Sequence, residues 1–309
     1  MEKLYARDIY GKTLVELGKK DPRIIVLDAD LSGSTRTSFF ANEFPDRFFN
    51  FGVAEQNMMA TAAGFAASGK IVFASTFAMF ASARALDQVR NSICYNNFDV
   101  KIVATHGGIT VGEDGASHQA LEDINFLRAI PNMKIVIPAD APEARDAVLA
   151  AANTPGPFYI RLGRSKVLTL ADRGEFALGK GYLLEKGENL AIITCGALVP
   201  EALAACRELN KEGISPTLAN LHTIKPIDEE LIVDIAKTHK RILVCEEHQV
   251  IGGLFSAVSE VLVRKFPVKV DRVGIEDRFG QSGVPRELLD FYGLSANSIA
   301  QKAKELLRQ

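Results

Sequence analysis

Short apolar segments alternate with helical segments along this chain, and no other feature of the sequence restricts the fold so strongly. In the first half the apolar segments are continuous and lie at residues 23–27, 71–74, 100–104, 134–137 and 158–161. Helical patterns separate them, near residues 7–19, 53–68, 78–95 and 141–152. Continuous apolar strands are typical of a parallel sheet that helices cover on both faces. We therefore predict an α/β domain built on a parallel sheet.

The second half repeats this alternation on a smaller scale. Strand patterns lie at residues 190–194, 217–221, 242–245 and 268–273, and helical patterns lie near residues 199–209, 228–237, 252–265 and 295–308. Between the halves, glycine, lysine and aspartate are scattered without a lasting period. We predict a first domain over residues 1–165, a linker over 166–187 and a smaller α/β domain over 188–309.

The composition is typical of a soluble globular protein. Of the 309 residues, 47% are hydrophobic and 24% are charged, and the net charge of −2 lacks the basic excess of a nucleic-acid-binding surface. No apolar segment is long enough to cross a bilayer, and the first residues lack the apolar core of a signal peptide. The widely spaced cysteines indicate reduced thiols in a cytoplasmic protein and no metal site. They are Cys94, Cys195, Cys206 and Cys245.

Glu55 is a lone carboxylate at the start of a predicted helix. The residues that follow it, 58–67, are small and apolar with no clear polar face, which predicts a helix buried against another protein surface. A charge at the start of a buried helix is expensive unless something hydrogen-bonds it. Two interpretations remain open at this point. The N–H groups of the helix hold Glu55 as a plain anion, or Glu55 binds a protonatable nitrogen of a ligand.

Polar side chains follow three of the predicted strands, where open α/β sheets bind their ligands. They lie in residues 28–34, 75–80 and 105–119. The third segment is rich in glycine and also contains two histidines and two acids. A flexible backbone with several titratable side chains favours a binding loop over a solvated connector.

Four strings of residues resemble the transketolase family of thiamine-diphosphate enzymes. They are Phe-Gly-Val-Ala-Glu-Gln at 51–56, Ser-Thr-Phe-Ala-Met-Phe at 75–80, Gly-Glu-Asp-Gly-Ala-Ser-His-Gln at 112–119 and Ala-Asn-Leu-His-Thr-Ile-Lys-Pro at 219–226. The resemblance covers nearly the whole chain. It implies a thiamine-diphosphate-binding pyrimidine domain with a parallel sheet, followed by the smaller α/β C-terminal domain of the family.

One motif of the family is missing. The Gly-Asp-Gly motif with a later Asn, which holds magnesium and the diphosphate, has no counterpart, and residues 113–115 fall in the substrate loop instead. The chain therefore resembles the C-terminal half of a split transketolase. The resemblance implies a second chain with the diphosphate-binding domain and the Mg²⁺ ligands, and a heterotetramer with two copies of each chain.

The resemblance also assigns the cofactor residues. Glu55 would hydrogen-bond N1′ of the aminopyrimidine, Phe77 and Phe80 would line the pyrimidine ring, and Asp30 and Leu31 would lie beside the cofactor. Ordinary core packing remains open for Leu31, as does ordinary helix packing for the two phenylalanines.

The same resemblance implies a substrate site. Asp114 and His118 match the pair that contacts the sugar hydroxyls near the reacting carbons. Ala83 departs from the family, which often has a tyrosine there. The substrate phosphate would be bound by a set of four polar side chains, and Arg161 would replace Arg164 in this set if the register differs. They are Arg7, Ser34, His106 and Arg164. His222 and His248 are assigned to structure.

The predicted function is the transfer of a two-carbon ketol unit from a ketose phosphate to an aldose phosphate, with the pentose phosphate pathway and the catabolism of an unusual sugar both left open as its setting. The main alternative is the same half of a deoxyxylulose-phosphate synthase, which His106 disfavours. The β chain of a pyruvate-type dehydrogenase lacks the Gly-Glu-Asp-Gly string. A non-catalytic stabilising subunit would have no reason to keep both Glu55 and the phosphate set.

Overall fold

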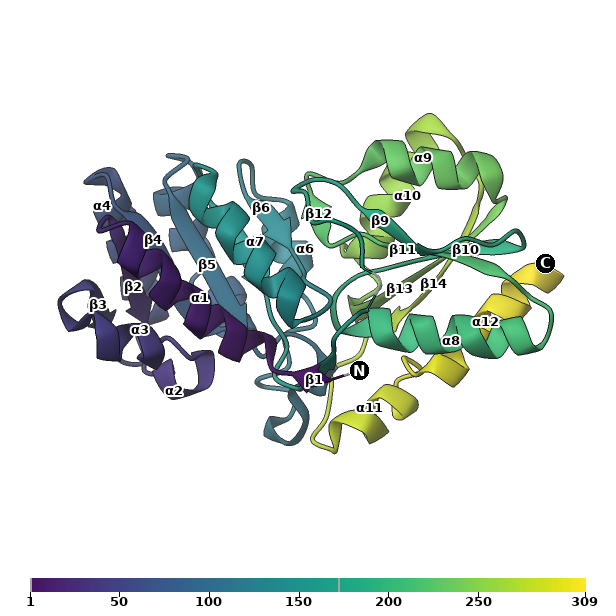
Figure 1. Cartoon of the computed structure of the whole chain (residues 1–309), viewed down its shortest axis with the longest axis horizontal. Coiled ribbons are helices and arrows are strands. Elements are labelled where there is room, and N and C mark those ends of the chain that lie inside the picture. Colours follow the sequence, from purple (N-terminus) through teal and green to yellow (C-terminus); the bar gives the residue numbers. More distant parts are fainter. Residues whose placement is uncertain (1, 172) are drawn as a thin grey trace.

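The first domain is built on a seven-stranded sheet. The computed structural model describes residues 2–171 and 173–309, and its sheet has the order β12-β6-β7-β5-β4-β2-β3 (Figure 1). Neighbouring strands are parallel except for β12, which comes from the second half of the chain and pairs antiparallel with β6. The strands are β2 (Ile24–Asp28), β3 (Phe48–Asn50), β4 (Ile71–Phe77), β5 (Val100–Thr105), β6 (Lys134–Val136), β7 (Phe158–Arg161) and β12 (Thr223–Lys225).

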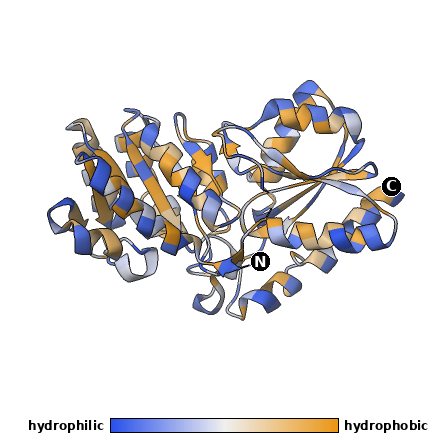
Figure 2. Cartoon of the chain, viewed as in Figure 1, coloured by the Kyte–Doolittle hydropathy of each residue, from blue (hydrophilic) through white to orange (hydrophobic). Residues whose placement is uncertain are grey.

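Helices cover both faces of this sheet, as the continuous apolar strands predict. On β2, Ile25 and Leu27 pack with Met58 of α4, whereas Val26 packs with Tyr10 of α1 on the opposite face. Figure 2 shows the hydrophobic strands between helices whose outer sides are hydrophilic. The helices are α1 (Ala6–Lys20), α2 (Ser32–Thr35), α3 (Ser38–Glu43), α4 (Glu55–Ala67), α5 (Leu86–Gln88), α6 (Asp123–Arg128) and α7 (Ala141–Asn153). Short helical turns complete them: η1 (Pro45–Arg47), η2 (Phe80–Arg84), η3 (Val89–Cys94) and η4 (Ile109–Asp114).

The second domain has a five-stranded sheet of order β14-β13-β10-β11-β9, in which only β9 is antiparallel to its neighbour. The strands are β9 (Tyr182–Glu185), β10 (Leu190–Thr194), β11 (Pro216–Asn220), β13 (Arg241–Gln249) and β14 (Lys269–Ile275). Figure 1 shows α9 and α10 on one side of this sheet, and α8 and α12 on the other. The helical elements are η5 (Gly196–Leu198), α8 (Val199–Lys211), α9 (Glu229–Thr238), α10 (Leu254–Lys265), α11 (Pro285–Phe291) and α12 (Ala296–Arg308).

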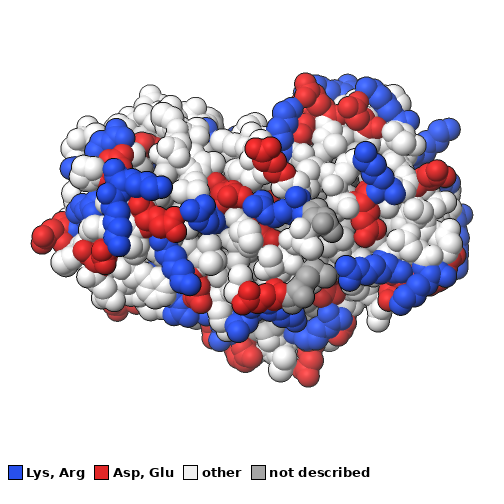
Figure 3. All heavy atoms as spheres, viewed as in Figure 1, with Lys and Arg blue, Asp and Glu red and all other residues white. Residues whose placement is uncertain are grey.

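The segment between the domains contains regular structure. β8 (Val167–Leu168) pairs antiparallel with β1 (Lys3–Leu4), and β9 joins the second sheet beside β11. The predicted α/β class with parallel sheets is confirmed. Figure 3 shows basic and acidic side chains interspersed over the viewed face, without a large patch of either sign. Within residues 2–171 and 173–309, no helix combines the length and apolar character that crossing a membrane requires.

The predicted helix over 78–95 is broken into shorter turns. Two π-helical turns, η2 and η3, flank the short helix α5. The hydroxyl of Ser82 donates to the carbonyl of Ala78 at 2.7 Å, so it competes with the backbone for that acceptor. π turns of this kind often occur at functional sites because they redirect side chains.

Candidate functional site

Glu55 begins α4 and is completely buried. Its Oε2 accepts a hydrogen bond from Arg84 Nη1 at 2.8 Å. Its Oε1 is buried and has no hydrogen-bond partner within the described part of the chain. An unpaired buried carboxylate oxygen costs about 1–3 kcal/mol or more. The Glu55 carboxylate therefore has capacity for one further donor.

Arg84 contacts both Glu55 and a candidate cofactor residue. Its guanidinium carbon lies 4.3 Å from the ring centroid of Phe80, and its side chain is 44% exposed. The sequence interpretation did not include Arg84. Its position four residues after Phe80 is a weak signal for such a contact, because residues at that spacing share a helix face. Ala83, at the position of the expected tyrosine, is exposed.

Two phenylalanines and two histidines gather at the carboxyl ends of β4 and β5. The ring of Phe77 stacks on His106 with centroids 3.7 Å apart, and Phe80 lies 5.9 Å from Phe77. His118 presents its ring edge-on to Phe80 at 5.3 Å. Phe77 is the register partner of Thr105 in the parallel β4–β5 pair, which brings the segments after both strands to the same edge.

His106 is a neutral group in this setting. Burial lowers its pKa to about 3, and the nearby charges of Arg7 and Arg164 act in the same direction. Its Nδ1 shares a 2.9 Å hydrogen bond with the Thr105 hydroxyl. At neutral pH His106 can therefore offer a hydrogen bond to a ligand but no positive charge.

The predicted phosphate residues lie near one another. Arg7 Nη1 donates to the carbonyl of Ser34 at 3.0 Å, and Arg7 Nε is buried without a partner among the described residues. Burial lowers the pKa of Arg7, and Arg36 and Arg164 contribute to this shift. Arg164 Nη1 donates to Glu113 Oε2 at 2.6 Å. Arg7 and Arg164 thus lie close enough to His106 to influence its pKa, and Arg7 connects them to Ser34.

Arg161, the alternative phosphate residue, is directed into the interior. It is 6% exposed, and its Nε donates to Asp123 Oδ2 at 2.8 Å. Its Nη2 donates to the carbonyl of Ala120 at 2.8 Å. Arg161 is therefore not available to an anion at the sheet edge, and Arg164 is the arginine placed there.

The loop after β2 is held by a buried carboxylate. Asp28 Oδ1 accepts from the Leu31 N–H at 2.6 Å, and its Oδ2 accepts from the hydroxyls of Thr35 and Thr37 at 2.7 and 2.8 Å. Burial raises the pKa of Asp28. Sequence interpretation placed Asp28 in a ligand-binding segment, whereas the structure shows that it fixes the backbone of Leu31.

Asp30 connects this loop to the segment before Glu55. The Asp30 N–H donates to Asn50 Oδ1, and Asn50 Nδ2 donates to Asp30 Oδ1, both at 3.0 Å. Asn50 Oδ1 also accepts from the Gly52 N–H at 3.0 Å. The sequence interpretation did not single out Asn50, because its role depends on pairing with a residue 20 positions earlier.

Asp114 and His118 lie at the end of the loop after β5. Asp114 is exposed and ends η4, and His118 is half-buried, with its Nδ1 2.9 Å from the Ser117 hydroxyl. Gly112 and Gly115 adopt φ angles of +83° and +77°, a conformation that favours glycine. The glycines allow the sharp turns that bring His118 back to Phe80.

Sequence comparison identifies both halves of the chain. The family model "Transketolase, pyrimidine binding domain" matches residues 2–168, and "Transketolase, C-terminal domain" matches residues 179–299. The chain belongs to the transketolase family. The resemblance to this family is thereby confirmed, as is its order of a pyrimidine-binding domain followed by a C-terminal domain.

Three relatives match this transketolase-family chain over almost its whole length. It is 51% identical over 304 residues to a Methanocaldococcus jannaschii protein named as a transketolase C-terminal section, covering 97% of this chain and 95% of that protein. It is 40% identical over 307 residues to the 6-deoxy-6-sulfo-D-fructose transketolase subunit SqwH of a Clostridium species, covering 99% of this chain and 95% of that subunit. A solved split-gene transketolase, an inactive β4 tetramer, is 48% identical with a TM-score of 0.92 and 99% of both chains covered.

Other relatives are longer proteins. The chain is 38% identical over 311 residues to human transketolase and covers 49% of its length. It is also 38% identical over 304 residues to the 1-deoxy-D-xylulose-5-phosphate synthase of Dictyoglomus thermophilum, again covering 49% of that enzyme. The transketolase-family chain therefore spans about half the length of these enzymes.

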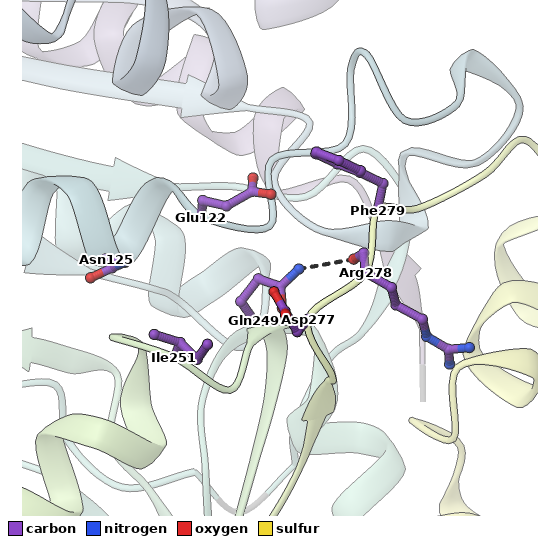
Figure 4. Close-up of a pocket in the computed structure, with 7 residues that line it drawn as sticks. All are labelled: Glu122, Asn125, Gln249, Ile251, Asp277, Arg278 and Phe279. Carbon is purple, nitrogen blue, oxygen red and sulfur yellow. Dashed lines mark hydrogen bonds between the residues drawn. The ribbon is translucent and has the colours of Figure 1, made fainter.

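A pocket of about 230 Å³ lies apart from the candidate site residues, at the junction of the two domains (Figure 4). Gln249 Nε2 donates to the carbonyl of Arg278 across it at 2.9 Å, and Phe279 stands at its side with 80% of its surface exposed. None of the predicted site residues lines this pocket. The pocket is lined by Glu122, Asn125, Gln249, Ile251, Asp277, Arg278 and Phe279.

The two histidines assigned to structure are buried in the second domain of this transketolase-family chain. His222 stacks on Phe176 with centroids 4.4 Å apart, and His248 Nδ1 lies 2.7 Å from the carbonyl of Gln249. Burial lowers the pKa of each to about 4, so both are neutral at neutral pH. Both side chains are fully buried, and the Nε2 atom of each has no hydrogen-bond partner among the described residues, so their assignment to structure stays a prediction.

Proposed function

We propose that this chain is a subunit of a split, thiamine-diphosphate-dependent transketolase that moves a two-carbon ketol unit from a ketose phosphate to an aldose phosphate. One observation carries the proposal. Glu55 Oε1 is buried without a partner within residues 2–171 and 173–309, and Arg84 connects this carboxylate to the ring of Phe80, which lies 5.9 Å from Phe77. A nitrogen heterocycle beside the aromatic rings would provide the missing partner, because a ring nitrogen can accept a hydrogen bond from the protonated Glu55 carboxyl.

The residues present fit thiamine diphosphate. Glu55 would share a proton between Oε1 and a pyrimidine nitrogen, Phe77 and Phe80 would contact the ring, and Asp30 and Leu31 would border it. When bound, the cofactor supplies a nucleophilic carbon and accepts the electron pair released as the ketose C2–C3 bond breaks. Neither matching family model is a diphosphate-binding domain, so we place the diphosphate and Mg²⁺ ligands on a second chain.

The loop after β5 would orient the sugar. Asp114 is exposed and can accept hydrogen bonds from hydroxyl groups, and the half-buried His118 lies against Phe80, next to the proposed cofactor ring. Fixed contacts to hydroxyl groups hold the bond that breaks in a reactive orientation and reduce the entropic cost of reaction. These two side chains would thus act on the substrate while Glu55 acts on the cofactor.

The substrate phosphate would lie beside His106. Arg7 and Arg164 would supply charge, and the neutral His106 and Ser34 would supply hydrogen bonds. In this structure Arg164 pairs with Glu113, a 61% exposed side chain that can move aside for a dianion. Arg7 Nε, which has no partner in the described part of the chain, supports an anion at this position.

A partner chain is supported by the exposed side of α4. One face of this helix is buried, but Gln56, Asn57, Ala60 and Gly64 are exposed. Val53, just before Glu55, is 74% exposed. A small-residue face next to the catalytic carboxylate suits close packing of another subunit over the site. We propose a heterotetramer of two such chains and two partner chains.

Coexpression with a chain that carries the diphosphate-binding domain tests the proposal. With thiamine diphosphate and Mg²⁺, the assembled particle should transfer ketol units, and this chain alone should show negligible transfer. Full activity of the isolated chain would refute the split arrangement. An assembled particle that does not bind thiamine diphosphate would refute the cofactor.

Two alternatives have support of their own among the relatives. One is the formation of 1-deoxy-D-xylulose 5-phosphate, after the name of the Dictyoglomus thermophilum synthase, and the other is 6-deoxy-6-sulfo-D-fructose as donor, after the name of the Clostridium subunit. The same particle should therefore be assayed with each donor. Turnover with a ketose phosphate at a higher kcat/KM than with either alternative supports our assignment. A non-catalytic stabilising subunit predicts no loss of turnover when Glu55 is replaced.

A further inference from the structure

The loop that carries Asp114 and His118 is held by a carboxylate from the second domain. Glu247, on β13, is 4% exposed, and its Oε1 accepts a hydrogen bond from the Thr110 N–H at 2.7 Å. Thr110 lies in the first turn of η4, which ends at Asp114. A carboxylate that accepts from a backbone N–H makes one of the stronger hydrogen bonds in proteins. Glu247 therefore fixes the point where the loop turns toward the site.

The loop backbone packs directly on this carboxylate. Gly108 has a φ of +90°, and a Cβ atom there would lie 2.3 Å from the Glu247 Cδ and Oε1 atoms. Real Cβ atoms essentially never approach that closely. Contact and hydrogen bond together define the path of residues 108–110 over Glu247.

Arg161 ties the end of the loop to the same strand. Its Nη2 donates to the carbonyl of Glu247 at 3.1 Å and to the carbonyl of Ala120 at 2.8 Å. The Ala120 carbonyl also accepts from the Gly108 N–H at 3.0 Å. Both ends of the loop are thus joined to each other and to β13.

A second group of contacts holds the middle of the loop. Gln119 Nε2 donates to the carbonyls of Ile109 at 3.2 Å and of Gln281, in the second domain, at 2.9 Å. At Gly115 a Cβ atom would lie 2.5 Å from the Ser282 hydroxyl oxygen. Residues 280–282 therefore lie against the loop on either side of Asp114.

We propose that Glu247 is a positioning residue for the substrate, through which the second domain sets the loop geometry that Asp114 and His118 need. The nature of the substrate rests on the function proposed above. The second domain then contributes to catalysis without contacting substrate or cofactor. It acts through the backbone of residues 108–110, supported by Gln119.

The adjacent residue provides a matched comparison. Glu246 is equally buried, but its Oε2 accepts from the Leu254 N–H at 2.7 Å and its Oε1 from the Phe255 N–H at 3.0 Å. Both donors belong to the start of α10, within the second domain. Replacing Glu246 should affect stability without reaching the loop.

The test uses the assembled enzyme with Glu247→Ala, Glu247→Gln and Glu246→Gln. We measure ketose KM, kcat, the Kd of thiamine diphosphate and hydrogen exchange of residues 106–118. Glu247→Ala should raise the ketose KM about tenfold, as expected for a lost charged hydrogen bond, and speed exchange in the loop. Its cofactor Kd should not change, because Glu55 lies on another element. Glu247→Gln should recover most of the effect, since the amide oxygen can accept from Thr110.

Several results would overturn the proposal. An unchanged KM and unchanged loop exchange in Glu247→Ala would do so, as would the same KM change in Glu246→Gln. If Glu247→Ala does not fold, Gln119→Glu is tested in its place, because the new carboxylate would face the carbonyls of Ile109 and Gln281. Unchanged hydrogen exchange of the loop in Gln119→Glu would also overturn the proposal. If the unmutated enzyme does not bind thiamine diphosphate, the proposed function is refuted. Hydrogen exchange of the loop would still decide whether Glu247 positions it.

Discussion

Two glutamates in the first turns of helices differ in how fully they are bonded. Glu55 begins α4, Glu143 lies in the first turn of α7, and both are completely buried. Glu143 Oε2 accepts from the Ala139 N–H at 2.6 Å, and its Oε1 accepts from the Tyr182 hydroxyl at 2.8 Å. Asn220 Nδ2 donates to Oε1 as well, at 3.1 Å. Among the described residues, Glu55 accepts a side-chain hydrogen bond from Arg84 alone.

The difference separates a structural carboxylate from a candidate catalytic one. Glu143 joins the helix start to two side chains of the second domain, so its bonds hold the domains together. Glu55 keeps one oxygen without a partner among the described residues. Buried polar atoms are nearly always bonded in native proteins, so an unpaired carboxylate oxygen near an aromatic cluster is a candidate for binding a ligand. Burial alone would not have distinguished the two residues.

The largest effect is expected from Glu55→Gln in the assembled enzyme. The amide keeps the shape and an acceptor for Arg84, but it cannot exchange a proton with the cofactor. Loss of a positioned acid or base costs about 10²–10⁴ in rate, so kcat should fall at least about 100-fold with an unchanged thermal midpoint. Steady-state kinetics and a melting curve check this, and near-normal turnover would remove Glu55 from the mechanism.

Glu143→Ala should affect stability instead of turnover. It leaves the Ala139 N–H, the Tyr182 hydroxyl and the Asn220 amide without their acceptor, at a cost of about 3 kcal/mol in the free energy of unfolding. Denaturant titration measures this loss. The kcat of the folded fraction should stay near that of the unmutated enzyme, and a selective loss of kcat would contradict the structural role.

Glu143 should also make stability depend on pH. Burial raises its pKa from 4.5 to about 7, outweighing its hydrogen bonds to Ala139, Tyr182 and Asn220. As pH rises from 4.5 to 7 the unfolded chain releases this proton first, so the folded state loses stability, by about 3 kcal/mol in all. Glu143→Gln has no such proton. The free energy of unfolding is measured for both proteins from pH 4.5 to 8. The excess stability of the unmutated chain over Glu143→Gln should shrink as pH rises, and a difference that stays constant would contradict this.

The smallest effect is expected at Arg84. Its guanidinium stacks on Phe80, so it must leave that ring before a cofactor ring can take the same contact, whereas its bond to Glu55 Oε2 leaves Oε1 for the cofactor. A partly exposed cation–π contact contributes about 1 kcal/mol. Arg84→Met should therefore tighten thiamine diphosphate binding about fivefold in calorimetry, while Arg90→Met on the same exposed segment should not. Weaker binding would show that Arg84 helps to hold the cofactor.

Much of the fold could be predicted because the deciding interactions are local. Continuous apolar strands such as 100–104 report burial on both faces, and they correspond to β5. The helix predicted over 78–95 was less accurate, because two π-helical turns flank the short helix α5 there, and an apolar pattern does not distinguish them from one regular helix. β12 could not be assigned to the first sheet, since its partner β6 lies almost 90 residues earlier and pairing with the second sheet was equally open.

For the candidate site, the sequence determined which residues follow the strands: Glu55, Phe77, His106 and His118 stand at one edge because parallel strands bring their carboxyl ends together. Only the tertiary structure decided what each residue contacts. Arg84 reaches Glu55 across 29 positions, and Glu247 reaches Thr110 across 137. Such pairs leave no periodic trace in the sequence, because they form only after the helices and domains have packed.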